Sequence, residues 1–182
     1  MRKLLLALSA LAILAACNNS GEQAATTTGS DTAAATSSKP VEFADAKYIE
    51  AGRAALPKFE AGDIEGWLSE FADNAVFQWS NGDSLAGKPA IIEYWTNRRK
   101  NAIDSIKFSN DIWLPVKINT PQRGPDLPGT WLLGWYQVNV KYKTGKSLQF
   151  WVHTDFHYNS ADKIDRAIQY IDFAPIKEAN AK

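Results

Sequence analysis

Apolar residues are distributed unevenly along the 182-residue chain. An apolar run, Leu4–Leu14, is followed by residues 18–40, which carry no aromatic or large aliphatic side chain, and aromatic residues recur only from Val41 onward. A segment without large apolar side chains cannot bury enough surface to offset the entropy that folding costs. The pattern therefore predicts a disordered tether at 17–42, one folded domain at 43–176 and a C-terminal tail at 177–182.

The first half of the predicted domain has mainly helical spacing. Phe43–Phe59 is rich in helix formers and predicts a helix, which Pro57 should kink or end. Gly62 followed by Asp63 predicts a helix end and then an N-cap. Pro89 is placed to open a further helix. The apolar positions of a short helix between them recur at i, i+3, i+4 and i+7; they are Ile64, Trp67, Leu68 and Phe71.

The second half has the residue types and alternation of β-strands. Asn81-Gly82 is a strong turn signal after the first strand. Helices that come mostly first, followed by a meander of strands, predict the α+β class. The predicted strands are Ala75–Trp79, Ser105–Asn119, Thr130–Lys143, Lys146–Asn159 and Lys163–Phe173.

Charge and composition exclude several classes of function. Lys and Arg number 20, as do Asp and Glu, so no excess of positive charge indicates a nucleic-acid partner. The chain has one Cys and two His, too few for a Cys-rich or multi-His metal site. We therefore expect no metal, no cofactor and no nucleic acid.

The N-terminus has the features of a secretion signal. Arg2 and Lys3 precede an apolar run that is too short to cross a bilayer, which needs about 20 residues. The segment Leu14–Cys17 resembles the bacterial lipobox, in which cleavage leaves a lipid-carrying Cys as the new N-terminus. The resemblance implies a lipoprotein signal peptide at 1–16, lipidation of Cys17 and a membrane anchor in the bacterial cell envelope. An ordinary signal peptide with an incidental Cys is the alternative. Asn18 is not the Asp of an inner-membrane retention signal, so the outer membrane is expected where the cell has one.

Short motifs along residues 43–176 carry a second resemblance. They are Phe59–Asp63, Phe71–Ala75, Gly82, Leu85–Ile92, Asp162–Ile164 and Tyr170–Asp172. In this order they resemble the nuclear transport factor 2-like superfamily, its SnoaL-like branch in particular. The resemblance implies a cone-shaped (cystatin-like) fold, with three N-terminal helices packed on a curved antiparallel sheet around a pocket. It also implies that a homodimer through the outer sheet face is to be considered.

The catalytic positions of this superfamily hold unreactive residues here. The carboxylate base of members similar to ketosteroid isomerase falls on Trp79, and their oxyanion-stabilising Tyr falls on Ala55. The acid of members similar to SnoaL cyclase or limonene epoxide hydrolase falls on Gln169. An indole cannot abstract a proton, a methyl group cannot donate one, and an amide is not an acid at pH 7. We therefore expect a binding protein rather than an enzyme.

One His–Asp pair keeps an enzymatic alternative open. His153 and Asp155 alternate with Thr154 on one predicted strand and so share a face. An imidazole beside a carboxylate can act as a general base, which would suit a metal-independent hydrolase, dehydratase or isomerase. The opposite face is more apolar and should pack against the helices, which favours the outer face for the pair. A one-residue bulge would reverse this assignment.

The expected pocket is mostly aromatic and aliphatic, with Thr154 and Gln169 as its polar groups. It would take a small apolar or amphipathic ligand, or the chain would bind a partner protein; simple core packing is the alternative for the Trp side chains. The expected lining residues are Trp67, Phe71, Phe77, Trp79, Trp95, Phe150, Val152, Thr154, Phe156, Gln169 and Ile171.

Two further groups have surface interpretations. Trp131, Trp135 and Trp151 are expected on the outer sheet face, where exposed aromatic residues would indicate an interface. Arg98-Arg99-Lys100 is expected to be a solvated helix end or, alternatively, a contact to a phosphate or lipid headgroup.

Overall fold

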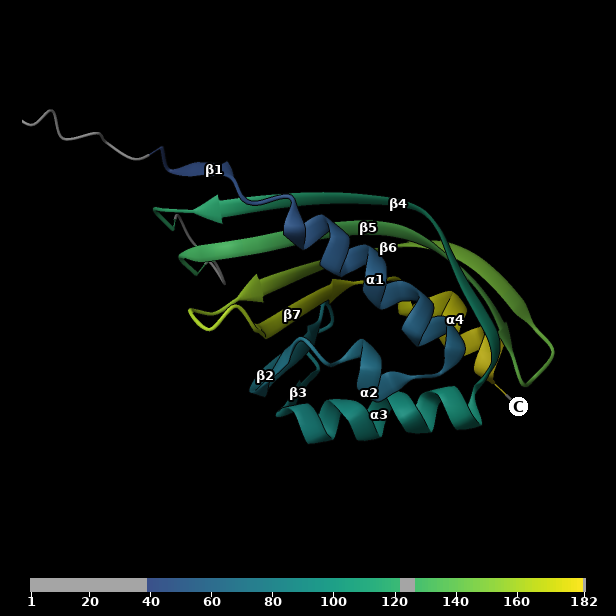
Figure 1. The fold of residues 1–182 in the computed structure, drawn as a ribbon. Helices are drawn as coiled ribbons and strands as arrows, with labels where there is room; N and C mark the ends of the chain where they lie inside the picture. Colours follow the sequence, from purple (N-terminus) through teal and green to yellow (C-terminus); the bar gives the residue numbers. More distant parts are fainter. Residues whose placement is uncertain (1–38, 122–126, 182) are drawn as a thin grey trace, which may run out of the picture. The chain divides into compact units, whose positions relative to one another are not determined.

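A computed structural model describes residues 39–121 and 127–181 (Figure 1). Cys17, the expected signal peptide and almost all of the expected tether lie outside the described residues. The described residues fold around one seven-stranded sheet in the strand order β1-β4-β5-β6-β7-β2-β3. The α+β class predicted from the sequence is confirmed.

The strands differ greatly in length. β4 and β5 are long enough to curve over the helices, as Figure 1 shows. The two shortest strands, β1 and β3, lie at the two edges of the sheet. The bounds are β1 Val41–Phe43, β2 Phe71–Trp79, β3 Ser84–Ala86, β4 Ile103–Ile118, β5 Gly129–Tyr142, β6 Ser147–Tyr158 and β7 Ile164–Tyr170.

The sheet is mixed, which corrects the expectation of a purely antiparallel one. β2 pairs with β7 in parallel, and both strands begin together because Phe71 pairs with Ile164. The physical reason is the position of the segment between α2 and β2. Its Glu70 carbonyl oxygen accepts a hydrogen bond from Ile164 N, the first residue of β7, at 2.8 Å. β2 therefore starts beside the start of β7 and must run in the same direction.

The described residues also form four helices, α1 Lys47–Ala61, α2 Ile64–Trp67, α3 Lys88–Asn101 and α4 Phe173–Asn180. The break between α1 and α2 is as predicted: Gly62 has φ 81°, and the Asp63 side chain accepts a hydrogen bond from Gly66 N. α1 continues past Pro57 to Ala61, so the expectation that Pro57 ends this helix is wrong, and its kink alternative stays a prediction.

Both ends of the folded domain differ from the sequence expectations. The first helix begins at Lys47 rather than Phe43, because Val41–Phe43 instead pair with β4 as an edge strand. The last strand ends at Tyr170, and Asp172 caps α4 by accepting a hydrogen bond from Ala174 N at 2.9 Å. α4 buries Ile176 and Ala179, so the expected tail boundary at 176 falls inside a packed helix. Phe71 also begins β2 instead of completing a helix.

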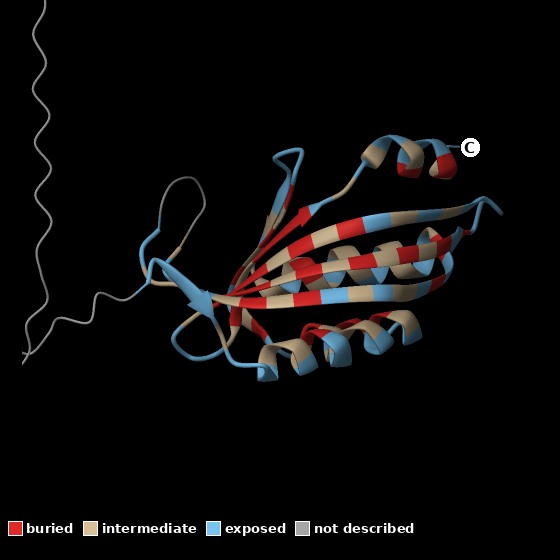
Figure 2. Cartoon of the chain, turned by 90° about the horizontal axis from the view of Figure 1, so that it is seen from above, coloured by how far each residue is buried: buried red, intermediate tan, exposed pale blue. Residues whose placement is uncertain are grey.

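Buried residues alternate with less buried ones along the long strands, as the colours in Figure 2 show. On β5 the inward positions are Tyr136, Val138, Val140 and Tyr142, all buried. Burial of this apolar face, at about 25 cal/mol per Å², holds the helices on the sheet. Among the described residues, no helix is long and apolar enough to span a membrane.

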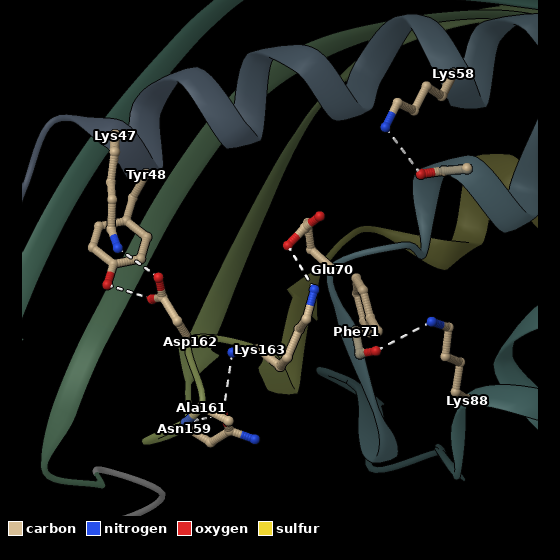
Figure 3. Close-up of polar contacts among 11 residues, drawn as sticks. Lys47, Tyr48, Lys58, Glu70, Phe71, Lys88, Asn159, Ala161, Asp162 and Lys163 are labelled. Carbon is tan, nitrogen blue, oxygen red and sulfur yellow. Dashed lines mark hydrogen bonds and ion pairs between the residues drawn. The ribbon is translucent and has the colours of Figure 1, made fainter.

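Polar contacts fix the start of α1 against the turn between β6 and β7 (Figure 3). Lys47 donates a hydrogen bond to the Asp162 carboxylate, and the Tyr48 hydroxyl donates to the same group at 2.7 Å. Next to this contact, Lys163 pairs with Glu70 at 3.1 Å. The first turn of α1 is thereby tied to an element more than one hundred residues later in the sequence.

Candidate functional site

A cavity lies between the helices and the inner face of the sheet. Its volume is about 80 Å³. The cavity is therefore smaller than the sites of drug-sized ligands, about 300–1,000 Å³, and would take a small molecule. Its lining is almost entirely apolar and aromatic. The lining residues are Leu56, Phe59, Trp67, Trp95, Arg98, Ile103, Ile106, Phe108, Tyr136, Val138, Val140, Tyr142, Phe150, Val152, Gln169, Ile171 and Ile176.

A chain of polar groups lies at the β7 side of the cavity. Trp79 Nε1 donates to Gln169 Oε1 at 3.1 Å, which fixes the orientation of the amide because an indole N–H can only donate. Gln169 Nε2 then faces Thr154 Oγ1 at 3.5 Å, and Thr154 shares a 2.8 Å hydrogen bond with the Tyr136 hydroxyl. Burial raises the pKa of Tyr136, with the Thr154 and Gln169 hydrogen bonds opposing it, so the hydroxyl stays protonated at neutral pH.

The expected pocket residues separate into three groups. Six line the cavity: Trp67, Trp95, Phe150, Val152, Gln169 and Ile171. Phe71 and Phe156 line a smaller neighbouring void of about 40 Å³, which Trp67 and Ala55 also border. Phe77, Trp79 and Thr154 are buried in the wall behind the cavity, where Trp79 packs on Phe77 and Tyr94.

His153 and Asp155 lie on the opposite sheet face from the cavity. His153 is stacked between Trp135 and Tyr170, at ring-centroid distances of 4.3 and 5.4 Å. Its Nε2 faces Asp155 Oδ1 at 2.8 Å and its Nδ1 faces the Gly134 carbonyl oxygen at 3.0 Å. Both ring nitrogens are thus occupied within the protein, and neither is presented to a substrate in the cavity. The enzymatic alternative required this pair to point into the cavity, and the geometry does not provide that.

The three tryptophans expected on the outer face have different surroundings. Trp151 is 51 % exposed, and Trp135 is partly covered by its stacking on His153. Trp131 is buried, because its ring packs on His157 and its Nε1 donates to the Leu127 carbonyl oxygen at 2.9 Å. Exposure was therefore the wrong expectation for Trp131, because His157 packs on its ring and a carbonyl group four residues earlier accepts its N–H.

Sequence reasoning missed several groups that line the cavity. Tyr136 and Tyr142 share the inner face of β5 with Val138 and Val140, so strand alternation alone was sufficient to find them. Arg98 was expected at a solvated helix end, but its side chain lines the cavity from the last turn of α3. Helical spacing was a signal for it, since Arg98 follows the buried Ile91 by seven positions and the cavity-lining Trp95 by three.

Comparison by sequence yields a match at the N-terminus of the chain. The model of the prokaryotic membrane lipoprotein lipid attachment site matches residues 1–18. This match supports lipid anchoring of the chain in a bacterial cell envelope. No curated protein sequence matches the chain.

Solved structures resemble the described domain closely in fold and distantly in sequence. A proposed polyketide cyclase from Xanthomonas campestris pv. campestris has a TM-score of 0.58 at 14 % identity, covering 73 % of this chain and 96 % of that one. A nuclear transport factor 2-like protein of unknown function from Burkholderia pseudomallei K96243 has a TM-score of 0.58 at 12 % identity, covering 74 % and 97 %. A protein from Catenulispora acidiphila DSM 44928 with a ketosteroid isomerase-like fold, solved with trimethylamine, has a TM-score of 0.53 at 10 % identity, covering 72 % and 92 %. Identities this low establish the fold and not the activity. The folded part of this chain therefore has the nuclear transport factor 2-like fold, and it follows the N-terminal lipid attachment site in the sequence.

Proposed function

We propose that this lipoprotein binds a small apolar or amphipathic molecule in the cavity without chemically changing it. The observation that carries the proposal is an apolar, aromatic-lined cavity of about 80 Å³ with a polar end at Gln169. Hydrophobic burial would supply most of the affinity, and the polar groups would orient the ligand.

The same geometry supports a non-catalytic role. Trp79 and Gln169 occupy the positions where similar enzymes carry acids, and here they hydrogen-bond to each other. Catalytic acids and bases need a pKa that suits proton transfer and access to the substrate. The neutral amide and indole have neither a titratable proton nor free orientation.

A neutral fluorescent probe tests this proposal. The protein is the whole mature chain, 17–182, with Cys17→Ser so that no lipid is attached and no detergent is needed. Phenylnaphthylamine, an uncharged apolar dye, is expected to bind with a rise in fluorescence. Ile171 is half-buried at the cavity, so Ile171→Trp should fill space there and weaken probe affinity about tenfold or more.

Val41→Trp is the matched control, because it adds the same ring at an exposed position of β1. Thermal unfolding of both variants verifies that they are folded. Absence of probe binding by the unsubstituted chain, or equal affinity in the Ile171→Trp variant, would contradict the proposal. Native mass spectrometry of the lipoprotein from its own envelope would then give the mass of the natural ligand.

A second proposal concerns the lipid anchor and the membrane that holds it. We infer that Cys17 is the lipidated residue and that the mature protein resides in the outer membrane where the cell has one. The match over residues 1–18 includes Cys17, the single Cys of the chain, and Asn18 follows it. Several acyl chains hold a protein firmly, since each buried CH₂ contributes about 0.8 kcal/mol.

A further inference from the structure

Arg98 brings a positive charge to one end of the apolar cavity. It lies in the last turn of α3 and is partly buried, and its side chain lines the cavity. The polar chain around Gln169 reaches β5 at Tyr136, whereas Arg98 lies at Tyr142, the last residue of β5. Six residues of strand correspond to about 20 Å. Val138 and Val140 line the cavity between these two polar ends.

The partners of Arg98 leave its charge without a counter-ion. Its guanidinium interacts with the Tyr142 hydroxyl, which Asn180 of α4 also approaches. Burial raises the pKa of Tyr142 while the Arg98 charge opposes this, so the hydroxyl is neutral at pH 7. Among the described residues, no carboxylate lies within 4.0 Å of Arg98, although Lys163 and Arg53 elsewhere each pair with one. A guanidinium has five N–H donors, and one neutral hydroxyl satisfies few of them.

The neighbouring Arg99 provides an instructive contrast. Arg99 Nη1 donates to the Ile103 carbonyl oxygen and Nη2 to the Glu60 carbonyl oxygen, at 3.4 and 3.2 Å. Its guanidinium therefore joins α3 to the end of α1 and the start of β4. Arg99 has a structural task, and Arg98, one residue before it, faces the cavity instead.

Other cations gather at the same end of the domain. Lys143 donates to the Lys100 carbonyl oxygen, and Lys146 donates to the Glu178 carbonyl oxygen at 2.9 Å. A carbonyl oxygen is neutral, so these hydrogen bonds leave both ammonium charges uncompensated. The end of the cavity formed by α3, the β5–β6 hairpin and α4 is therefore positive and would attract an anion.

Trp95 adds a second unsatisfied donor at the cavity. Its ring lines the void, and its indole N–H is buried without a hydrogen-bond partner among the described residues. A buried donor without an acceptor is unfavourable, and a ligand acceptor would remove this cost. Trp95 and Arg98 lie three positions apart on α3, which places them on the same side of the helix.

We propose that the cavity selects an apolar molecule that carries an anionic head group, with Arg98 pairing the head group and Trp95 donating to an acceptor on the same ligand. The proposal rests on the ligand-binding function above and specifies the class of ligand. Guanidinium groups suit this task because their planar array of donors matches the oxygens of a carboxylate, phosphate or sulfonate.

Two dyes with the same aromatic skeleton test the proposal. Anilinonaphthalene sulfonate carries an anionic group, and phenylnaphthylamine lacks it. On the whole mature chain with Cys17→Ser, in about 0.15 M salt so that distant charges are screened, the sulfonate dye should bind more tightly than its neutral analogue. Arg98→Gln should weaken sulfonate binding about tenfold, the loss expected for a hydrogen-bonded charge pair, and leave the neutral dye unchanged.

Three further variants separate this role from general effects. Lys100→Gln removes the same charge from an exposed position of the same helix and should change neither affinity. Arg98→Lys should recover part of the sulfonate affinity, and Trp95→Phe, which keeps a ring and loses the N–H, should weaken sulfonate binding. Decanoate should displace the sulfonate dye at lower concentration than decanol does, which extends the preference to carboxylates.

The outcomes distinguish the two proposals. If neither dye binds, the proposed function itself is wrong. If both dyes bind equally well, or if Arg98→Gln and Lys100→Gln weaken sulfonate binding to the same extent, ligand binding stands and selection of an anion by Arg98 is overturned. Thermal unfolding of each variant identifies any loss of affinity that comes from unfolding.

Discussion

At the scale of single residues, Trp113 of β4 shows how closely this core is packed. Its ring lies between two glycines from different elements, Gly52 of α1 and Gly134 of β5. A Cβ on Gly52 would lie 2.9 Å from two ring carbons, and a Cβ on Gly134 would lie even closer. Trp113 Nε1 also donates to Asp111 at 2.7 Å, which limits how far the ring can shift. The small residues are therefore required by a close approach and not by backbone freedom.

Gly134→Ala should destabilise the domain, because the new methyl group overlaps the Trp113 ring. Overpacking of this kind costs about 1–3 kcal/mol in the free energy of unfolding, measurable by urea denaturation. Combining it with Trp113→Leu should cost less than the sum of the two single changes, since the smaller side chain removes the overlap. Strictly additive costs would show that the ring is not what opposes the methyl group.

The sequence could identify residue types at this scale but few of their contacts. Strand alternation placed Val152 and Thr154 opposite His153 and Asp155, and the structure has them on opposite faces. Alternation could not indicate that Trp79 and Gln169, ninety residues apart, would hydrogen-bond to each other. That contact exists because β2 and β7 are neighbours in the sheet, and Trp79 pairs with Gln169 in their register.

At the scale of elements, the start of α1 is held by charge on the turn between β6 and β7. Asp162 has φ 59°, a left-handed conformation that Asp and Asn tolerate better than most residues. Hydrogen bonds from Lys47 and then Tyr48 lower the pKa of the Asp162 carboxyl group. A carboxyl group whose pKa is lower in the folded state stabilises that state above its unfolded pKa. This contribution is lost as the pH falls through the folded pKa.

Asp162→Asn should therefore lower the thermal midpoint at neutral pH, and its effect should diminish as the pH falls below the usual Asp pKa and through the lowered pKa of Asp162. Asn keeps the left-handed conformation, so the change isolates the charge. The measurement is thermal unfolding by circular dichroism across this pH range. Asp104→Asn, which breaks an exposed pair with Lys141, is the control and should leave the profile nearly unchanged. A constant difference between Asp162→Asn and the unsubstituted chain at all pH values would contradict the assignment.

At the scale of the whole molecule, the outer sheet face offers a site for a second copy of the chain. Ile112, Trp135, His153 and Tyr170 form one cross-strand row over β4, β5, β6 and β7. Ile112 is 57 % exposed and Tyr170 43 %, and the exposed Trp151 lies nearby on β6. We propose that this row forms a homodimer interface, since contiguous exposed apolar groups mark interaction surfaces.

Trp151→Glu should shift the protein from dimer to monomer in analytical ultracentrifugation, because a carboxylate would be buried without a partner at the interface. Ser84→Glu adds the same charge on β3, away from the row, and should leave the sedimentation coefficient unchanged. A monomer before any substitution would exclude the interface. An unchanged dimer in Trp151→Glu would place the interface elsewhere.

The sequence by itself determined the features that depend on local composition and on periodicity. The N-terminal pattern indicated a lipid attachment site, and helices followed by alternating strands indicated an α+β domain. The short motifs indicated the nuclear transport factor 2-like fold, because turns and caps such as Gly62-Asp63 depend on neighbouring residues. Only the tertiary structure decided which distant residues meet. The parallel pairing of β2 with β7 and the packing of α4 on the domain both depend on contacts between residues far apart in the sequence. These are long-range constraints, and they have no counterpart in the spacing of residues along the chain.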